Sequence, residues 1–170
     1  MTRRMTKPIV NLNELQFETV GNEKRFVAKR APVSSRIGAE KLGYAVFEIP
    51  PGKSAYPYHA HREIEEMFLI LEGAGTLRQA GEEYPVSMGD FICSPSDPNQ
   101  PHQLINSSCD PLRYLALSNQ VGADVMHYPD SGKFGVWQGD SSDPHGPGGF
   151  VAFVKDTAVV DYWDGEDDDE

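Results

Sequence analysis

Short extended runs, each interrupted by glycine or proline, dominate the middle of this 170-residue sequence and restrict the folds open to it. Turn residues recur there at spacings of about ten residues, which is typical of a sandwich or a small barrel. No stretch between residues 41 and 117 has the 3.6-residue periodicity of an amphipathic helix. The sequence therefore predicts one all-β domain.

The expected strands can be given by residue range. They cover residues 41–49, a strand around His59, 67–72, a hairpin of 76–79 with 80–84, 91–94, 102–106, 112–117 and 150–154. The alternating run Arg25–Lys29 is predicted to add an edge strand. Beyond residue 120 the composition otherwise indicates loops, and residues 159–163 are expected to dock before an acidic end.

Four residues form a candidate metal site. His59 and His61 are two apart, a spacing that puts both imidazoles on one face of a strand. Glu66 precedes the apolar run of residues 67–71, where a buried carboxylate needs a partner, and His102 follows later. These donors suit one divalent transition metal (zinc, manganese, iron, nickel or cobalt) better than calcium or magnesium. Glu65 is the alternative carboxylate, but it faces the other side if Glu66 points inward.

Several further residues could support that site. Asn106 is expected to lie behind the ligands or to cap a strand rather than to bind the metal. Tyr56 and Tyr58 flank the histidines and either shape the mouth of a pocket or pack in the core. Arg78 and Lys133 are candidates for pairing with an anionic substrate, although exposed bases usually have no specific partner.

The quoted residues resemble the two signature segments of the cupin superfamily. The first segment has a glycine, His-x-His, a glutamate and a second glycine, and the second has a glycine, a proline, a histidine and an asparagine. The matching residues are Gly52, His59, His61, Glu66 and Gly73, then Gly89, Pro95, His102 and Asn106. Two departures are one extra residue before His59 and a longer stretch, residues 96–101, before His102. The resemblance implies a double-stranded β-helix, a jelly-roll-like barrel.

This resemblance also suggests a division of the chain. We expect an N-terminal arm at residues 1–37, a barrel core at 38–120, a C-terminal extension packing on the barrel at 121–164, and an acidic tail at 165–170. The C-terminal segments look like those of compact single-domain bacterial cupins, some of which are labelled sugar-phosphate isomerases. That label is an analogy about function rather than a property of these residues.

Three functions are compatible with an open metal site. The first is isomerisation of a sugar or sugar phosphate, although the motifs lack the cluster of Arg and Lys that a phosphate usually recruits. The second is an Fe(II)-dependent dioxygenase, and the third is a non-catalytic protein that binds a metabolite. All three imply a small-molecule ligand, and the sequence leaves open whether the protein is an enzyme.

Composition restricts the partners and the setting. Residues 161–170 carry −7 of the net charge of −11, and the absence of a basic cluster in the rest of the chain argues against nucleic acid. Without an apolar stretch of bilayer length or a signal peptide, we expect a cytoplasmic protein with no membrane contact. Cys93 and Cys109 are expected to be free thiols, with Cys93 in the core. A homodimer is expected through the exposed edge at residues 26–28.

Overall fold

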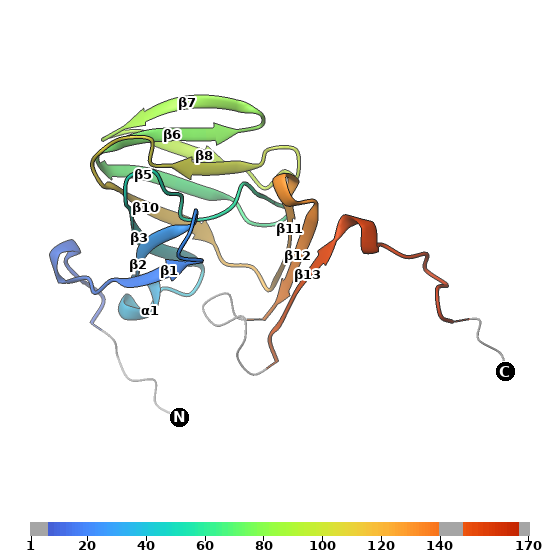
Figure 1. Ribbon diagram of the computed structural model, residues 1–170. Coiled ribbons are helices and arrows are strands. Elements are labelled where there is room, and N and C mark those ends of the chain that lie inside the picture. The colour runs from blue at the N-terminus through green and yellow to red at the C-terminus, as the bar shows by residue number, and fades with distance from the viewer. Residues whose placement is uncertain (1–6, 140–147, 167–170) are drawn as a thin grey trace.

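The computed structural model describes residues 7–139 and 148–166, and nearly all of its regular structure is antiparallel sheet (Figure 1). The strands are β1 (Glu18–Gly21), β2 (Val27–Pro32), β3 (Leu42–Ile49), β4 (Ala60–His61), β5 (Glu66–Glu72), β6 (Ala74–Gln79), β7 (Glu82–Ser87), β8 (Phe91–Ser94), β9 (His102–Ile105), β10 (Leu112–Asn119), β11 (Ala123–Tyr128), β12 (Lys133–Gln138) and β13 (Phe150–Lys155). Helical turns are short: η1 (Leu12–Glu14), α1 (Ser34–Ile37), η2 (Pro129–Ser131) and η3 (Asp156–Ala158).

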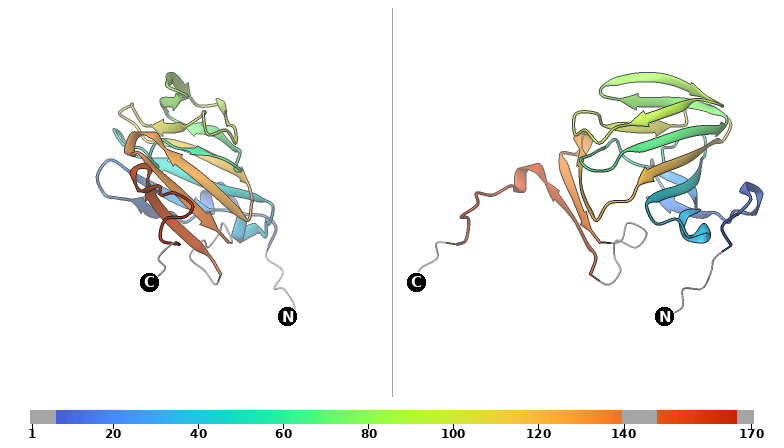
Figure 2. Two further views of the ribbon diagram at one scale, coloured as in Figure 1. Left: turned by 90° about the vertical axis from the view of Figure 1, so that its right-hand side faces the viewer. Right: turned by 180° about the vertical axis from the view of Figure 1, so that it is seen from behind.

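The described strands form three sheets, and nearly all residues of the hydrophobic core come from the six-stranded sheet and from the sheet of β6, β7 and β9. The strand orders are β1-β2-β3-β10-β5-β8, β7-β6-β9 and β13-β12-β11-β4. Figure 1 shows the β6–β7 hairpin at the top and β11 to β13 forming the wall on the right, while Figure 2 shows the same sheets from two other sides. The arrangement confirms the predicted all-β, double-stranded β-helix barrel.

Most strands of the middle region follow the predicted alternation. In β5, Phe68 and Ile70 are buried in the core, as the inward-facing half of a period-two pattern requires. The predicted hairpin is formed by β6 and β7, with Ala80 and Gly81 in its turn at φ values of 51° and 90°. Two successive positive φ values are the geometry of the tight hairpin turn that matches the strand twist.

The N-terminal edge differs from the prediction. Residues 27 and 28 belong to β2, which pairs with β1 on one side, and β2 also pairs with β3. The unpaired edges of this sheet are therefore β1 and β8, and the run at residues 26–28 is not an exposed edge. The short β1 segment is poorly alternating, so its pairing could not be read from local pattern.

The region after residue 120 contains two strands that the sequence did not predict, β11 and β12. The turn-rich segment Tyr128–Lys133 is the η2 turn that joins them. Asp124 interrupts the apolar alternation of β11, and Gly135 does the same in β12 because Phe153 and Met126 pack closely over it. The strand predicted at residues 150–154 is confirmed as β13.

Two predictions about burial are wrong. Residues 159–163 do not dock: Tyr162 is 82% exposed and Trp163 62%, and the chain leads away from the barrel after η3 (Figures 1 and 2). Cys93 is an exposed free thiol rather than a core residue, because Ile92 and Ser94 are the inward-facing residues of β8. Cys109 is also a free thiol. Residues 167–170 of the acidic tail lie outside the described residues.

Among the described residues, no helix is long and apolar enough to cross a membrane.

Candidate metal centre

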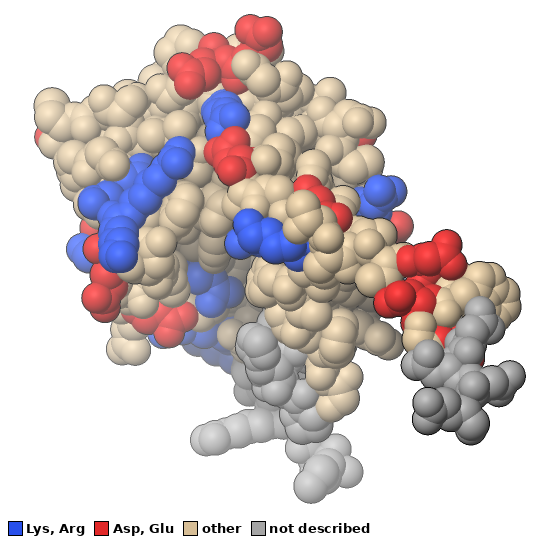
Figure 3. Space-filling model, turned by 45° about the vertical axis from the view of Figure 1, so that its right-hand side comes forward, with Lys and Arg blue, Asp and Glu red and all other residues tan. Residues whose placement is uncertain are grey.

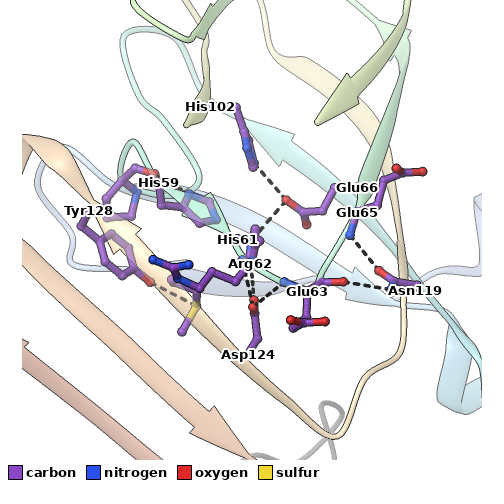
Figure 4. A network of polar contacts seen from close by, with 12 residues as sticks. His59, His61, Arg62, Glu63, Glu65, Glu66, His102, Asn119, Asp124 and Tyr128 are labelled. Carbon is purple, nitrogen blue, oxygen red and sulfur yellow. Dashed lines mark hydrogen bonds and ion pairs between the residues drawn. The ribbon is translucent and has the colours of Figure 1, made fainter. Parts of the chain in front are cut away.

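Pairing between distant segments brings the candidate ligands together. The backbone N–H of His59 donates to the carbonyl of His102 at 3.1 Å, and the N–H of His102 donates back to His59 at 2.7 Å. His61 lies in β4, where it is the register partner of Met126 in β11. Glu66 is the first residue of β5, and its side chain lies between those of His61 and His102 (Figure 4).

The side-chain distances define a compact cluster. Glu66 Oε2 is 2.9 Å from His102 Nε2 and 3.6 Å from His61 Nε2. The possible ligand atoms of His59, His61 and Glu66 all lie within 4.8 Å of one another. His102 lies outside that three-residue group but contacts the same carboxylate oxygen. All four predicted ligands are therefore neighbours around Glu66.

Hydrogen bonds fix the orientation of two of the imidazoles. His59 Nδ1 lies 2.8 Å from the Pro57 carbonyl oxygen, and His61 Nδ1 lies 2.5 Å from Asp124 Oδ2. Each acceptor requires an Nδ1–H donor, which leaves Nε2 directed at the cluster. His61 Nε2 is buried and has no hydrogen-bond partner in the described structure. A buried nitrogen without a partner, beside a carboxylate and two more imidazoles, fits a divalent transition metal.

Asp124 is a site residue that the sequence did not reveal. Asp124 is 2% exposed, and its Oδ1 accepts the backbone N–H groups of Arg62, Glu63 and Val125 at 3.1, 3.0 and 2.8 Å. The other oxygen holds His61. A carboxylate behind a ligating histidine fixes the ring and raises its basicity. The sequence signal for Asp124 is an isolated acidic residue among apolar ones. The segment that contains it was not predicted to be a strand.

The cluster perturbs the pKa values of its members. Burial, with the neighbouring His102 and His61, lowers the pKa of His59 to about 3, so this imidazole stays neutral near pH 7. Burial also lowers the pKa of His61, but the hydrogen bond to Asp124 and the charge of Glu66 outweigh it and the net shift is upward. For Glu66, burial is outweighed by the hydrogen bond from His102 and the nearby imidazoles, which lower its pKa to about 2.

The alternative carboxylate and the asparagine lie away from the cluster. Glu65 points away from the histidines, and its backbone N–H donates to Asn119 Oδ1 at 2.8 Å (Figure 4). Asn106 is buried, and its side-chain amide donates to the carbonyls of Ile49 and Asp110 at 2.7 and 2.8 Å. These hydrogen bonds connect the end of β3 to the loop between β9 and β10.

The flanking tyrosines and bases have different roles. Tyr56 lines the cavity, with its ring 6.4 Å from that of His59. Tyr58 is instead buried under Arg78, whose guanidinium lies 3.7 Å from the ring centroid and makes two hydrogen bonds to Asp130. Lys133 lies over the ring of Tyr128 at 4.9 Å. Neither base faces the cluster as a free anion receptor.

A cavity of about 780 Å³ opens beside the cluster. Its walls come from the six-stranded sheet on one side and from β11, β12 and β13 on the other. On the face drawn in Figure 3, Lys and Arg form separate small groups among mostly uncharged side chains, not one basic patch. Few of the residues that line the cavity are charged, and the cavity reaches the histidines and Glu66.

The fold and the cluster together define a β-barrel that contains a group of side chains of the kinds that bind a metal. Comparison with known proteins agrees: the model of the cupin domain matches residues 45–118. This segment contains His59, His61, Glu66 and His102. Over residues 45–118 the chain therefore matches the cupin domain.

Individual relatives share part or most of the chain. An uncharacterised protein of Methanocaldococcus jannaschii is 37% identical over 70 residues, which are 41% of this chain and 54% of that protein. An oxalate-binding protein of Thermotoga maritima is 31% identical over 74 residues, 44% of this chain and 59% of the relative. The chain thus spans somewhat more than half the length of the curated relatives it matches.

Some solved structures resemble nearly the whole chain. One is a putative sugar phosphate isomerase from Acidithiobacillus ferrooxidans, with a TM-score of 0.77 and 23% identity, covering 91% of this chain and 96% of that one. At this identity the likeness establishes the shared fold.

Proposed function

We propose that this cupin holds one divalent transition metal through His59, His61, Glu66 and His102 and binds a small organic molecule beside it. The observation that supports this most directly is the buried, unpartnered Nε2 of His61, which faces Glu66 at the end of a large cavity. Four protein ligands leave one or two coordination positions for an exogenous molecule. A site of this kind suits binding or catalysis better than a purely structural role.

The chemistry divides between the metal and the chain. When bound, a divalent ion supplies Lewis acidity to an oxygen of the ligand. Pro57 and Asp124 hold the imidazoles of His59 and His61 in the orientation that presents Nε2. Tyr56, which lines the cavity and is 46% exposed, lies where the cavity meets the surface.

Metal analysis tests the site itself. Protein purified without added metal should contain about one transition metal per chain, and the His59→Ala/His61→Ala variant should contain little. The matched control is His127→Ala, because His127 stacks on Phe134 away from the cluster. Full metal content in the double variant would refute the assignment.

Activity assays can distinguish an isomerase, a dioxygenase and a non-catalytic metabolite-binding protein. The name of the Acidithiobacillus structure makes sugar-phosphate isomerisation the first activity to assay. Turnover with zinc in the absence of oxygen would support an isomerase. Oxygen consumption with iron alone would support a dioxygenase, and tight binding without turnover would support a metabolite-binding protein.

We further propose that the protein forms a homodimer through the β8 edge of its six-stranded sheet. Phe91 in β8 is 72% exposed beside the exposed Met88, and an unpaired apolar edge favours association with a second copy. Light scattering at micromolar concentration should give a dimer mass that falls to a monomer in Phe91→Lys but not in Val160→Lys. A monomeric wild-type protein would refute this proposal.

A further inference from the structure

The cavity is much larger than a metal ion and its water ligands require. A volume of about 780 Å³ lies in the upper part of the range found for pockets that bind organic ligands, about 300–1,000 Å³. The cavity begins at the histidine and glutamate cluster. It extends between the six-stranded sheet and the sheet of β13, β12, β11 and β4. The ligand of this protein therefore has a body that contacts the walls as well as a group that reaches the metal.

Aromatic side chains make up much of the wall. They come from strands on both sides of the cavity and from the loop before β4: Tyr44, Phe47, Tyr56, Phe68, Tyr114, Tyr128, Trp137 and Phe153. Some of these rings are held by their neighbours, since Phe47 stacks on Tyr114 at 5.1 Å and Tyr128 on His59 at 5.7 Å. Facing aromatic walls favour a flat, apolar ligand body, which can pack against rings on either side.

The charges of the wall do not suit a phosphate ester. Among the described residues that line the cavity, Arg30 is the single Lys or Arg, and its Nη1 is already 3.5 Å from Glu18 Oε1. The other lining carboxylate is Glu66 in the cluster. A phosphate monoester carries about 1.5 to 2 negative charges near pH 7 and usually recruits several basic donors. The charged residues of the cavity wall therefore suit a ligand of low charge better than a phosphate ester.

One buried hydroxyl is available to such a ligand. Tyr114 is 3% exposed and lines the cavity. Phe47 and Phe68 pack on two sides of its ring, at 5.1 and 5.6 Å, so its direction is fixed. Burial, then the nearby Tyr56 and Glu66, raises the pKa of Tyr114 well above its usual value, so the hydroxyl stays a donor.

We propose that the cavity binds a small aromatic acid with adjacent oxygen donors, which reach the metal cluster while the ring packs among the aromatic walls and Tyr114 donates a hydrogen bond to one of those oxygens. This inference rests on the metal site proposed above. It assigns the ligand class as hydroxybenzoate-like rather than sugar-phosphate-like, and it makes Tyr114 a residue that determines specificity.

Calorimetry with three probes tests the ligand class. The protein is first loaded with one zinc per chain, verified by metal analysis, and then titrated with salicylate, oxalate or glucose 6-phosphate. Oxalate chelates a metal without offering a ring, so burial of the salicylate ring should make salicylate bind at least about tenfold more tightly. Glucose 6-phosphate should bind more weakly than salicylate.

Variants test the residues. Tyr114→Phe should weaken salicylate binding by about three- to tenfold through loss of one hydrogen bond. The matched control is Tyr84→Phe on β7, at a half-exposed tyrosine outside the cavity wall, which should bind as the wild type does. Should Tyr114→Phe fail to fold, Phe153→Ala supplies a second test, because Phe153 is an exposed member of the wall whose truncation should also weaken salicylate binding.

The outcomes separate this inference from the proposed function. Zinc binding with salicylate no tighter than oxalate, or weaker than glucose 6-phosphate, overturns the aromatic ligand and leaves the metal site standing. Tighter salicylate binding that Tyr114→Phe does not change overturns the role of Tyr114. A protein that takes up no zinc overturns both proposals.

Discussion

The imidazole of His61 and the carboxylate of Asp124 are 63 residues apart in the sequence and share a buried hydrogen bond of 2.5 Å. Asp124 cannot rotate away, since its other oxygen accepts three backbone N–H groups. The bond directs His61 Nε2 at Glu66, where it has no other partner. Asp124 therefore holds His61 in the orientation that metal binding through Nε2 would require.

Replacing Asp124 with Asn should lower metal affinity by about 10- to 100-fold, the usual cost of losing a hydrogen-bonded carboxylate behind a ligand. The neutral amide neither polarises the imidazole nor fixes its proton on Nδ1. Competition against a chromophoric chelator measures the change. Asp130→Asn is the matched control, because Asp130 pairs with Arg78 outside the cluster. Equal affinities in the two variants would contradict the role given to Asp124.

The clustering of His59, His61 and Glu66 could be predicted from sequence because the information for it is local. His59 and His61 share a face through their spacing, and Glu66 begins a strand whose alternation places Phe68 and Ile70 inward. Asp124 could not be predicted in the same way. Its contact with His61 depends on the pairing of β11 with β4, a long-range register that no local pattern specifies.

Local alternation also leaves the inward face of a strand undecided. In β8 the residues Ile92 and Ser94 point inward, so that the apolar Phe91 and Cys93 are exposed. A one-residue change of register would reverse this, and only the pairing of β8 with β5 fixes it. This is why the strand was predicted correctly while the burial of Cys93 was not.

Adjacent glutamates provide a matched pair of substitutions. Glu66→Gln should lower the metal affinity, because it keeps the size of the side chain and one oxygen donor but removes the charge among the imidazoles. Glu65→Gln should leave the affinity unchanged, since Glu65 points away from the cluster (Figure 4). Chelator competition on both proteins measures the difference. Loss of affinity in Glu65→Gln alone would mean that the wrong carboxylate has been assigned.

The pair of Arg78 and Asp130 links β6 to the η2 turn and should make stability depend on pH. The hydrogen bond from Arg78 lowers the pKa of Asp130 below its ordinary 3.8, against a smaller opposing effect of burial. A lowered pKa in the folded state stabilises the protein above the unfolded value, and this contribution is lost as pH falls through the folded value.

Urea denaturation of Asp130→Asn should therefore give a free energy of unfolding about 0.5 kcal/mol below wild type at pH 7, because the pair is partly exposed. The difference should shrink once the pH is well below 3.8. In an Arg78→Met background the Asp130→Asn change should have little further effect. A difference that is the same at pH 7 and pH 2 would show that the ion pair is not its cause.

Zinc should raise the thermal stability of the folded chain. The site gathers His59, His61 and Glu66 only when the segments around β4 and β5 are in place, so the metal binds the folded state in preference to the unfolded one. Free zinc at 100 times its dissociation constant should then stabilise the protein by about 2.7 kcal/mol, which raises the Tm by about 5 to 10 °C for a chain of this size. Scanning calorimetry of metal-free protein with and without zinc measures the shift. The His59→Ala/His61→Ala variant should show almost none, whereas His127→Ala should respond as the wild type does; equal shifts in all three proteins would mean that zinc binds elsewhere.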